Sequence, residues 1–418
     1  MDKKFSHFLE ELTWRGIAFQ KTPGIEEVLK KKTTLYIGID PTGDSLHVGH
    51  LFGLLTLKRA VDAGHSAIVI MGGGTALIGD PSGKEKERPV LSRDAVEENK
   101  KKLKKQIDAL LKNSATKIIS ARSAPHPTLS VVDNAQWLEK VQLIEFLRDA
   151  GKFVTVNAML DLETVKTRMD KKEGMSYAEF TYQLLQAYDF LKLHEEYECQ
   201  AQIGGSDQWG NMVQGIELIR KKTGKNTYAL SIPLIVNPKT GKKFGKTESG
   251  TAMWLDPEKT HPFAFYQFLL NSDDEMAPTL LKYFSFKERG EIEKIENEWN
   301  VARELRGIQK ALAYELTKMI HGEKIAQEAQ AVSALLFEQN FKSLKNQDID
   351  FIKDSIPYIK TSKENFALEQ ALVDTELCSS KNEAKRLVEQ KGVSAELLLE
   401  KYYLIKKGKR EFGIVEIT

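Results

Sequence analysis

A strand–helix–strand pattern near the amino terminus most limits how this chain can fold. Residues 33–39 (TTLYIGI) form a short β-branched and apolar run, a helical pattern follows from about Leu46 to Ala63, and a second apolar run covers Ala67 to Met71. Two strands joined by a helix within about 40 residues are typical of a parallel crossover unit, because parallel neighbours need a long connection. The pattern therefore predicts an α/β fold with a parallel sheet, whose ligands bind outside the carboxyl ends of the strands.

The overall composition limits the classes of protein to which the chain can belong. Of its 418 residues, 41% are hydrophobic and 29% are charged, which fits a globular protein with a sizeable core. The net charge is +2, so any binding of nucleic acid must use a local basic patch. No apolar run approaches the roughly 18 residues of a membrane-spanning helix, and Cys199 and Cys378 lack the spacing of a disulfide framework or a zinc site. We therefore expect a cytoplasmic protein that does not bind membranes and has no metal site of its own.

Polar and small residues cluster around the turn after the first strand. Thr42 follows the strand in a Pro-Thr-Gly turn, and His47 and His50 then lie three residues apart in the first turn of the helix. The amino-terminal end of a helix favours anions, and Gly49 between the histidines lets a ligand approach the backbone. Two histidines at this spacing are also compatible with an ordinary helix cap. The face of the strand that leads into this turn presents, at alternate positions, Tyr36, Gly38 and Asp40.

The string that contains these residues, YIGIDPTGDSLHVGH, resembles the first signature of class I aminoacyl-tRNA synthetases, and Tyr-x-Gly-x-Asp-Pro-Thr is characteristic of the tyrosyl enzymes. A second string, GGGTALIGDPSGK (72–84), is not a P-loop, because Ile78 stands where that motif requires a glycine. Taken alone, it is compatible with a glycine-rich turn at a strand end. The resemblance instead implies that Asp80 binds the substrate's ammonium group and that Lys84 and Arg88 contact phosphate.

A helical string, SYAEFTYQLLQAYDF (176–190), places Tyr182, Gln186 and Asp189 on one face. Taken alone, this face is compatible with an exposed polar stripe. The string closely matches the helix with which tyrosyl synthetases bind their amino acid, which implies that Asp189 and Tyr36 read the tyrosine hydroxyl. Phenylalanine would leave both groups unpaired, at a cost of about 1–3 kcal/mol for a buried neutral group. The tyrosine-binding residues that the resemblance implies are Tyr36, Asp80, Tyr182, Gln186, Asp189, Gln202 and Gln208.

Two further strings contribute to nucleotide binding by the same resemblance. In QIGGSDQWGN (202–211), a strand runs through two glycines into a helix, where Asp207 is also compatible with a simple cap. The string KTGKKFGKTESG (239–250) is typical of a flexible loop, and its KFGKT part resembles the second class I signature. The ATP-binding residues implied are Gly38, Asp40, Gly49, Gly205, Asp207 and Lys246. The residues implied to align ATP and stabilise departing pyrophosphate are Thr42, His47, His50, Lys84, Arg88, Lys243, Lys246 and Thr247.

The carboxy-terminal stretch contains two short helical patterns within residues 366–393 and a basic run over residues 401–410. Taken alone, the basic run is equally compatible with a solvated surface that binds nothing. The helix pair resembles the ribosomal-protein-type RNA-binding domain of bacterial tyrosyl synthetases, with Lys381, Lys385 and Arg386 on its RNA face. The chain departs from that family at residues 394–396, which lack the usual Val-x-hydrophobic-Asn-Gly hairpin. A second departure is Ile37 with Gly53, where some relatives carry small polar side chains toward the ribose.

The resemblances together imply a bacterial-type tyrosyl-tRNA synthetase, a homodimeric ligase of protein biosynthesis. Such an enzyme activates L-tyrosine with ATP to tyrosyl-adenylate and pyrophosphate, and then transfers tyrosine to the 3′ end of tyrosine tRNA. ATP is a substrate, and Mg²⁺ accompanies the nucleotide without a dedicated protein site. One alternative is a tryptophanyl-tRNA synthetase, which has no use for the paired Tyr36 and Asp189. The other is a non-catalytic RNA-binding paralogue, which would show erosion of the histidines and lysines in the two signatures.

The implied fold is α/β, with a Rossmann-like parallel-sheet catalytic domain followed by a helical domain and a small α+β RNA-binding domain. The catalytic domain, with an inserted dimer-forming segment, is expected over residues 1–225. The lysine-signature loop and a helical anticodon-side domain are expected over 226–341, and a linker over 342–361. The RNA-binding domain of ribosomal-protein type is expected over 362–418.

Overall fold

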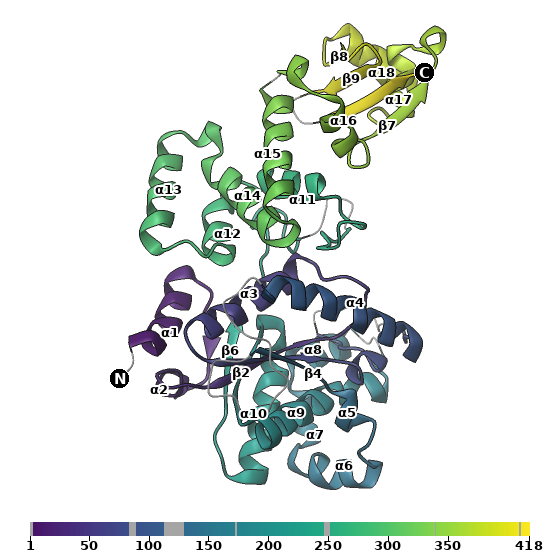
Figure 1. Cartoon of the computed structure of the whole chain (residues 1–418). Coiled ribbons are helices and arrows are strands. Elements are labelled where there is room, and N and C mark those ends of the chain that lie inside the picture. The colour runs from purple at the N-terminus through teal and green to yellow at the C-terminus, as the bar shows by residue number, and fades with distance from the viewer. Residues whose placement is uncertain are drawn as a thin grey trace. The chain divides into compact units, whose positions relative to one another are not determined.

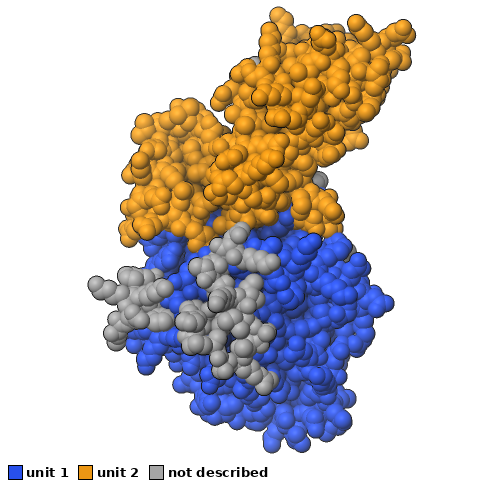
Figure 2. All heavy atoms as spheres, in the orientation of Figure 1, with its two compact units in different colours: residues 1–255, 282–284 blue, residues 256–281, 285–418 orange. Residues whose placement is uncertain are grey.

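The computed structural model describes residues 3–82, 89–112, 129–171, 174–245, 251–338, 340–408 and 411–418. The chain forms two compact units, which are coloured separately in Figure 2. The first comprises Met1–Leu255 with Lys282–Phe284, and the second comprises Asp256–Leu281 with Ser285–Thr418. Among the described residues, no helix combines the length and apolar character needed to cross a membrane.

A six-stranded sheet with the order β1-β6-β5-β2-β3-β4 lies at the centre of the first unit. Neighbouring strands are parallel except for β1, which pairs with β6 in the antiparallel sense. This sheet confirms the predicted α/β class, although β1 and β4 were not expected from the sequence. The strands are β1 (Gln20–Lys21), β2 (Thr34–Ile39), β3 (Ser66–Met71), β4 (Leu129–Asp133), β5 (Cys199–Gly205) and β6 (Tyr228–Ile232).

Helices cover both faces of this sheet, which is why its central strands are apolar on both sides. Figure 1 shows α3 (Val48–Asp62) and α4 (Arg93–Lys112) on one face, and α9 (Tyr177–Tyr197) and α10 (Trp209–Thr223) on the other. The core between the sheet and the second pair of helices includes Tyr36, Ile68 and Phe190. Full burial of a large apolar side chain contributes roughly 1.5–3 kcal/mol, so this layer holds the strand ends in fixed positions.

Short helices complete the first unit. A buried ion pair fixes α8 against α9, because Arg168 donates two hydrogen bonds to Glu179, at 2.8 and 3.2 Å, and both side chains are almost fully buried. The short elements are α1 (Lys3–Arg15), α2 (Ile25–Leu29), η1 (Thr75–Leu77), α5 (Ala135–Leu138), α6 (Leu143–Asp149), η2 (Gly151–Phe153), α7 (Val156–Leu160), α8 (Glu163–Asp170) and η3 (Ser206–Gln208).

The second unit begins with helices and ends with a four-stranded sheet of order β7-β10-β9-β8. Its helices are α11 (Pro262–Leu270), α12 (Ala277–Phe284, whose last three residues group with the first unit), α13 (Arg289–Val301), η4 (Arg303–Leu305), α14 (Gly307–His321), α15 (Glu323–Phe337), η5 (Phe341–Ser343), α16 (Asn346–Ile352), η6 (Lys363–Asn365), α17 (Leu368–Asp374) and α18 (Lys381–Glu389). Its strands are β7 (Tyr358–Thr361), β8 (Val393–Leu398), β9 (Tyr402–Lys407) and β10 (Glu411–Ile417). The residues of α17 and α18 that pack on the sheet include Leu372 and Ala384.

Two expected boundaries differ from the structure. The first unit continues to Leu255 rather than ending near residue 225, because β6 pairs with β5 and completes the parallel sheet. The stretch 342–361, expected to be a linker, contains α16 and β7, and β7 pairs with β10. Although this stretch is polar in composition, the side chains of Ile349 and Ile352 are fully buried and anchor α16.

Candidate active site

A cavity of about 530 Å³ opens at the carboxyl ends of β2 and β5. These strands are neighbours, but the chain continues from β2 toward β3 on one side and from β5 toward β6 on the other. Ligands of open α/β sheets bind at such a topological switch point. The predicted residues that line the cavity are Tyr36, Gly38, Asp40, Thr42, His47, Gly49, His50, Asp80, Tyr182, Gln186, Asp189, Gln202, Gly205, Asp207, Gln208 and Lys243.

The other predicted site residues fall into two groups. Lys84, Arg88, Lys246 and Thr247 lie outside the described residues. The three predicted RNA-binding residues belong to α18 of the second unit, where all of them are exposed: Lys381, Lys385 and Arg386.

A buried carboxyl and a buried hydroxyl lie at one end of the cavity. Asp189 is 4% exposed and accepts hydrogen bonds from Asn134 Nδ2 at 2.8 Å and from Trp137 Nε1 at 2.7 Å. Burial raises the pKa of Asp189 to about 8, although these two hydrogen bonds oppose the shift. The Tyr36 hydroxyl is buried and has no hydrogen-bond partner among the described residues. Burial also raises the pKa of Tyr36, and the charge of Asp189 adds to this shift. The pair can therefore exchange hydrogen bonds with a hydroxyl group of a ligand.

A chain of hydrogen bonds runs along the cavity from this carboxyl. Asn134 Nδ2, which contacts Asp189, also donates to Thr75 Oγ1 at 2.9 Å. Thr75 Oγ1 donates to Asp40 Oδ1 at 2.7 Å, and the Tyr182 hydroxyl donates to Asp40 Oδ2 at 2.8 Å. The Tyr182 hydroxyl hydrogen is thus donated to Asp40, and the hydroxyl oxygen can still accept a hydrogen bond from a ligand.

Three residues of this arrangement were missed by the sequence analysis: Thr75, Asn134 and Trp137. Asn134 directly follows β4 and Trp137 lies in α5, so recognition of the LSVVD run as a strand could have indicated them. The Gly72 backbone leaves space for the neighbouring carboxylate, because a Cβ atom there would lie 1.8 Å from Asp40 Oδ1. The glycine-rich string therefore has a packing role in addition to its turn.

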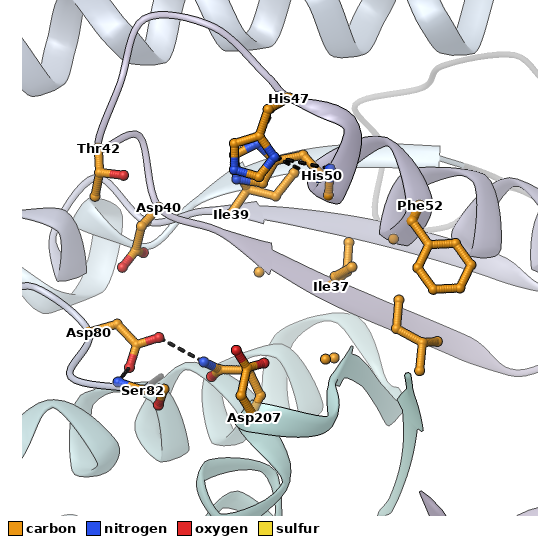
Figure 3. A pocket seen from close by; sticks show the side chains of 18 of the residues that line it. Ile37, Ile39, Asp40, Thr42, His47, His50, Phe52, Asp80, Ser82 and Asp207 are labelled. Atoms are coloured by element: carbon orange, nitrogen blue, oxygen red, sulfur yellow. Dashed lines mark hydrogen bonds between the residues drawn. The ribbon is translucent and has the colours of Figure 1, made fainter. Parts of the chain in front are cut away.

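The cavity wall also carries the acceptor groups of Asp80 and Gln202. Asp80 accepts a hydrogen bond from Ser82 N at 2.9 Å and another from Gln208 Nε2 at 2.7 Å (Figure 3). The Gln202 side chain is buried, and its Oε1 has no hydrogen-bond partner among the described residues. The Asp80 carboxylate suits a cationic hydrogen-bond donor such as an ammonium group, and the Gln202 oxygen can accept a hydrogen bond from a ligand.

The two signature histidines form a reciprocal cap at the start of α3. His47 Nδ1 accepts from the backbone N–H of Gly49 at 3.1 Å and of His50 at 3.3 Å, while His50 Nδ1 accepts from His47 N at 3.3 Å. The rings stack with centroids 3.7 Å apart. Because Nδ1 is the acceptor in both rings, each neutral imidazole carries its proton on Nε2 and can donate from that atom. Figure 3 shows the two rings across the cavity from Asp80 and Asp207.

This cap also engages the backbone of Gly49. The Gly49 N–H donates to His47 Nδ1. A Cβ atom at this position would lie 2.9 Å from His47 Cε1. A side chain at this position would therefore require the imidazole to shift. The ring nitrogens of the two histidines therefore add to the backbone N–H donors at this end of the helix.

The lysine-signature segment is attached to the beginning of α3. Val48 N donates to Met253 O, and Leu255 N donates to Leu46 O. Gly245 has a φ of +94°, which side-chain-bearing residues rarely adopt, and a Cβ atom at this position would lie 3.3 Å from Val48 Cβ. These contacts bring Lys243 to the cavity, where its Nζ lies 3.2 Å from Asp207 Oδ2.

Ile37 and Gly53 fit together on the cavity wall. Ile37 and Gly53 both line the cavity, and a Cβ atom at Gly53 would lie 2.4 Å from Ile37 Cδ1. Ile37 therefore fills the space that a side chain at position 53 would occupy.

No group of three or more His, Cys, Asp or Glu residues suited to a metal ion occurs within the described ranges.

Comparisons with known proteins identify the family. The family model for tRNA synthetases class I (W and Y) matches residues 29–338. The tyrosine–tRNA ligase of Staphylococcus epidermidis is 43% identical and covers 97% of this chain and 98% of its own length. That of Roseiflexus castenholzii is 44% identical over 92% of this chain and 90% of its own length. A C-terminally truncated mitochondrial tyrosyl-tRNA synthetase of Aspergillus nidulans has a TM-score of 0.71 at 29% identity, covering 80% of this chain and 98% of that one.

The fold and the cavity therefore define a class I tRNA synthetase of the W and Y group. Within that class, the chain belongs to the tyrosine–tRNA ligase family. The predictions of an enzyme and of an aminoacyl-tRNA ligase are thereby confirmed. A tryptophanyl-tRNA synthetase of Plasmodium falciparum, with a TM-score of 0.54 at 14% identity, is similar in fold alone.

Proposed function

We propose that the cavity of the first unit carries out both steps of tyrosine–tRNA ligation. In the first step, a carboxylate oxygen of L-tyrosine attacks the α-phosphorus of ATP, and the bond from that phosphorus to pyrophosphate breaks. In the second step, the terminal ribose hydroxyl of tyrosine tRNA attacks the tyrosyl carbonyl, and AMP leaves. The observation that carries the proposal is the buried Tyr36 hydroxyl, unpartnered among the described residues, at the same end of the cavity as Asp189.

Recognition of the tyrosine side chain follows from that pair. The phenolic hydroxyl of the substrate donates to Asp189 and accepts from Tyr36, so each buried group gains a partner on binding. Phenylalanine offers neither interaction, and each neutral group left unpaired costs about 1–3 kcal/mol. Asp80, Gln186 and the Tyr182 oxygen bind the ammonium group. Gln202 and Gln208 orient the bound tyrosine, Gln208 through its contact with Asp80.

The nucleotide is proposed to lie between the two signatures. The Nε2–H groups of His47 and His50 donate to phosphate oxygens of ATP, and Thr42 and Lys243 approach the departing pyrophosphate from the turn and the lysine segment. Asp207 and the Gly205 backbone hold the ribose. The attacking carboxylate is already an anion near pH 7, so the step needs no general base. Acceleration comes from alignment and from stabilising negative charge as it develops, and Mg²⁺ would enter with the nucleotide.

The remaining proposed partners use other surfaces. The exposed cations of α18 (Lys381, Lys385 and Arg386) suit contact with the phosphates of tyrosine tRNA. The exposed apolar side chains of α6 and α7 suit a homodimer, since Leu143 and Ile144 are 69% and 73% exposed. A cytoplasmic location is supported by the two unpaired, buried cysteines, which fit a reducing compartment.

Amino-acid-dependent exchange of labelled pyrophosphate into ATP tests the first step. Exchange with tyrosine, but not with phenylalanine or tryptophan at matched concentrations, is the expected result. Asp189→Asn should narrow the preference for tyrosine over phenylalanine. Exchange driven by tryptophan would overturn the specificity, and folded protein that exchanges with none of the three amino acids would favour an RNA-binding paralogue.

A further inference from the structure

Asn211 lies behind the cavity wall, in the first turn of α10, and its side chain holds three cavity groups together. Its residue is 6% exposed. Its Nδ2 lies 3.0 Å from Gln186 Oε1, 3.3 Å from Gln208 Oε1 and 3.3 Å from Ser82 Oγ. A side-chain amide has two N–H hydrogens, so at least one of these three contacts shares a hydrogen. One buried donor therefore draws two glutamine oxygens toward the same point.

These contacts fix the orientation of both glutamine amides, and each amide oxygen keeps a second lone pair. Because Gln208 directs its Oε1 to Asn211, its Nε2 is directed to Asp80 Oδ2, which it meets at 2.7 Å. Ser82 N donates to the other oxygen, Asp80 Oδ1, at 2.9 Å. Both oxygens of the Asp80 carboxylate are thus oriented, one directly by the Ser82 backbone and the other through Gln208 and Asn211.

We propose that Asn211 is a positioning residue that presents the hydrogen-bond acceptors of Gln186 and Asp80 to the ammonium group of tyrosine. This inference rests on the proposed function. An ammonium group offers three donors and no acceptor, so every group that surrounds it must present oxygen. If the Gln186 amide turned over, an NH₂ group would replace an oxygen at the ammonium. If the Gln208 amide turned over, its oxygen would face the Asp80 carboxylate, and their hydrogen bond would become a repulsive contact.

Loss of Asn211 should affect affinity differently for ligands with and without an ammonium group. Loss of the Asn211 donor frees both amides to turn and leaves two glutamine oxygens without their buried partner. Affinity should fall for ligands that carry the ammonium group and should remain for ligands that lack it. The aromatic end of the tyrosine pocket is held by Asn134 and Trp137, which do not contact Asn211 in any described hydrogen bond.

The test uses the full chain with Asn211→Leu and three ligands: L-tyrosine, tyramine and 3-(4-hydroxyphenyl)propionate. Tyramine keeps the ammonium group without the carboxylate, and the propionate keeps the carboxylate without the ammonium group. Dissociation constants should rise roughly tenfold or more for tyrosine and tyramine, as expected for loss of a hydrogen bond to a charged group, and should stay within twofold for the propionate. In pyrophosphate exchange, KM for tyrosine should rise while kcat changes little.

A matched control is Gln214→Leu, one turn further along α10. Gln214 is also buried, but its Nε2 donates to Ala158 O at 3.2 Å rather than to a cavity group. This variant should bind all three ligands like the unchanged chain. If Asn211→Leu does not fold, Asn211→Ala is measured with the same ligands and judged by the same ratio.

Equal weakening of the three ligands by the Asn211 variant would overturn the proposed positioning role, because it would show a general packing defect. Unchanged affinity for tyrosine would overturn it as well. If the unchanged chain itself binds tyrosine no more tightly than the propionate, the assignment of the ammonium site fails, which is a separate result from failure of Asn211 alone.

Discussion

Asn134 Nδ2 lies 2.8 Å from Asp189 Oδ2 and thereby joins the end of β4 to the middle of α9. With Trp137 on the other oxygen, the contact holds the carboxyl in one orientation. Each carboxylate oxygen has a further lone pair, so the group can still accept a hydrogen bond from a ligand. The specificity of the cavity is therefore set by side chains from distant parts of the chain.

Tyr36→Phe should separate stability from specificity. The Tyr36 hydroxyl is buried, and the described residues offer it no partner, so its removal should leave the melting temperature of the ligand-free chain unchanged or raise it. The same change should weaken tyrosine binding about tenfold and leave phenylalanine binding unaffected. Thermal unfolding and calorimetric titration with both amino acids would check this. A drop in melting temperature without any change in tyrosine affinity would contradict the assigned role.

Asp189 should make stability depend on pH. Burial raises the pKa of Asp189 from its ordinary 3.8 to about 8. Between these values, the folded chain retains a proton that the unfolded chain releases, so the contribution of Asp189 to stability falls as the pH rises through this window. Asp189→Asn removes this dependence. The melting temperature of the variant minus that of the unchanged chain should therefore become more positive from pH 5 to pH 8, in the absence of ligand. A difference that is constant over this range would show that Asp189 titrates near its ordinary pKa.

Gln106 of α4 should support the rate of the first step. Its Oε1 accepts from Leu46 N at 2.8 Å, directly before His47, and Leu46 O accepts from Leu255 N at 2.8 Å. Gln106→Met removes the acceptor and should lower kcat for pyrophosphate exchange roughly tenfold, since small displacements of aligned groups slow reactions, with the dissociation constant for tyrosine unchanged. Gln106→Glu keeps an acceptor and should restore most of the rate. Equal losses in both variants would show that the contact with Leu46 is not the cause.

The cations of α18 should matter for tRNA but not for adenylate formation. Replacing all three by glutamate should slow aminoacylation at least tenfold and reduce its dependence on salt, because fewer phosphates would be neutralised. Pyrophosphate exchange should be unchanged. The residues replaced are Lys381, Lys385 and Arg386, and a control with the same change in charge carries glutamate at the exposed positions Lys31, Lys32 and Lys225. Equal slowing by both sets would point to net charge rather than to an RNA face.

The exposed apolar face of α6 should hold two copies together. Ile144→Glu places a charge on that face and should convert a dimer to a monomer at micromolar concentration in sedimentation analysis. Val301→Glu, at a position that is 89% exposed in the second unit, is the matched control and should leave the mass unchanged. An unchanged chain that sediments as a monomer would rule out the proposed homodimer.

The sequence was most informative where strands end in recognisable strings. The parallel sheet, the two signatures and the polar face of α9 could all be predicted, because spacing determines which side chains share a strand face or a helix face. Contacts between distant segments could not be predicted in this way. Asn134 and Thr75 reach Asp189 and Asp40 only through the folded sheet, and the role of Gly49 depends on the rotamer of His47.

The two hydrogen bonds that hold Asp189 also set conditions for redesigning the cavity to accept a non-natural amino acid. An apolar residue at position 189 would leave the Asn134 amide and the Trp137 indole N–H without their acceptor, at a cost of about 1–3 kcal/mol for each buried donor. A successful design would therefore change these positions as a set and keep Thr75 supplied with a donor. Libraries that vary position 189 alone would be expected to yield unstable or inactive proteins before they yield new substrates.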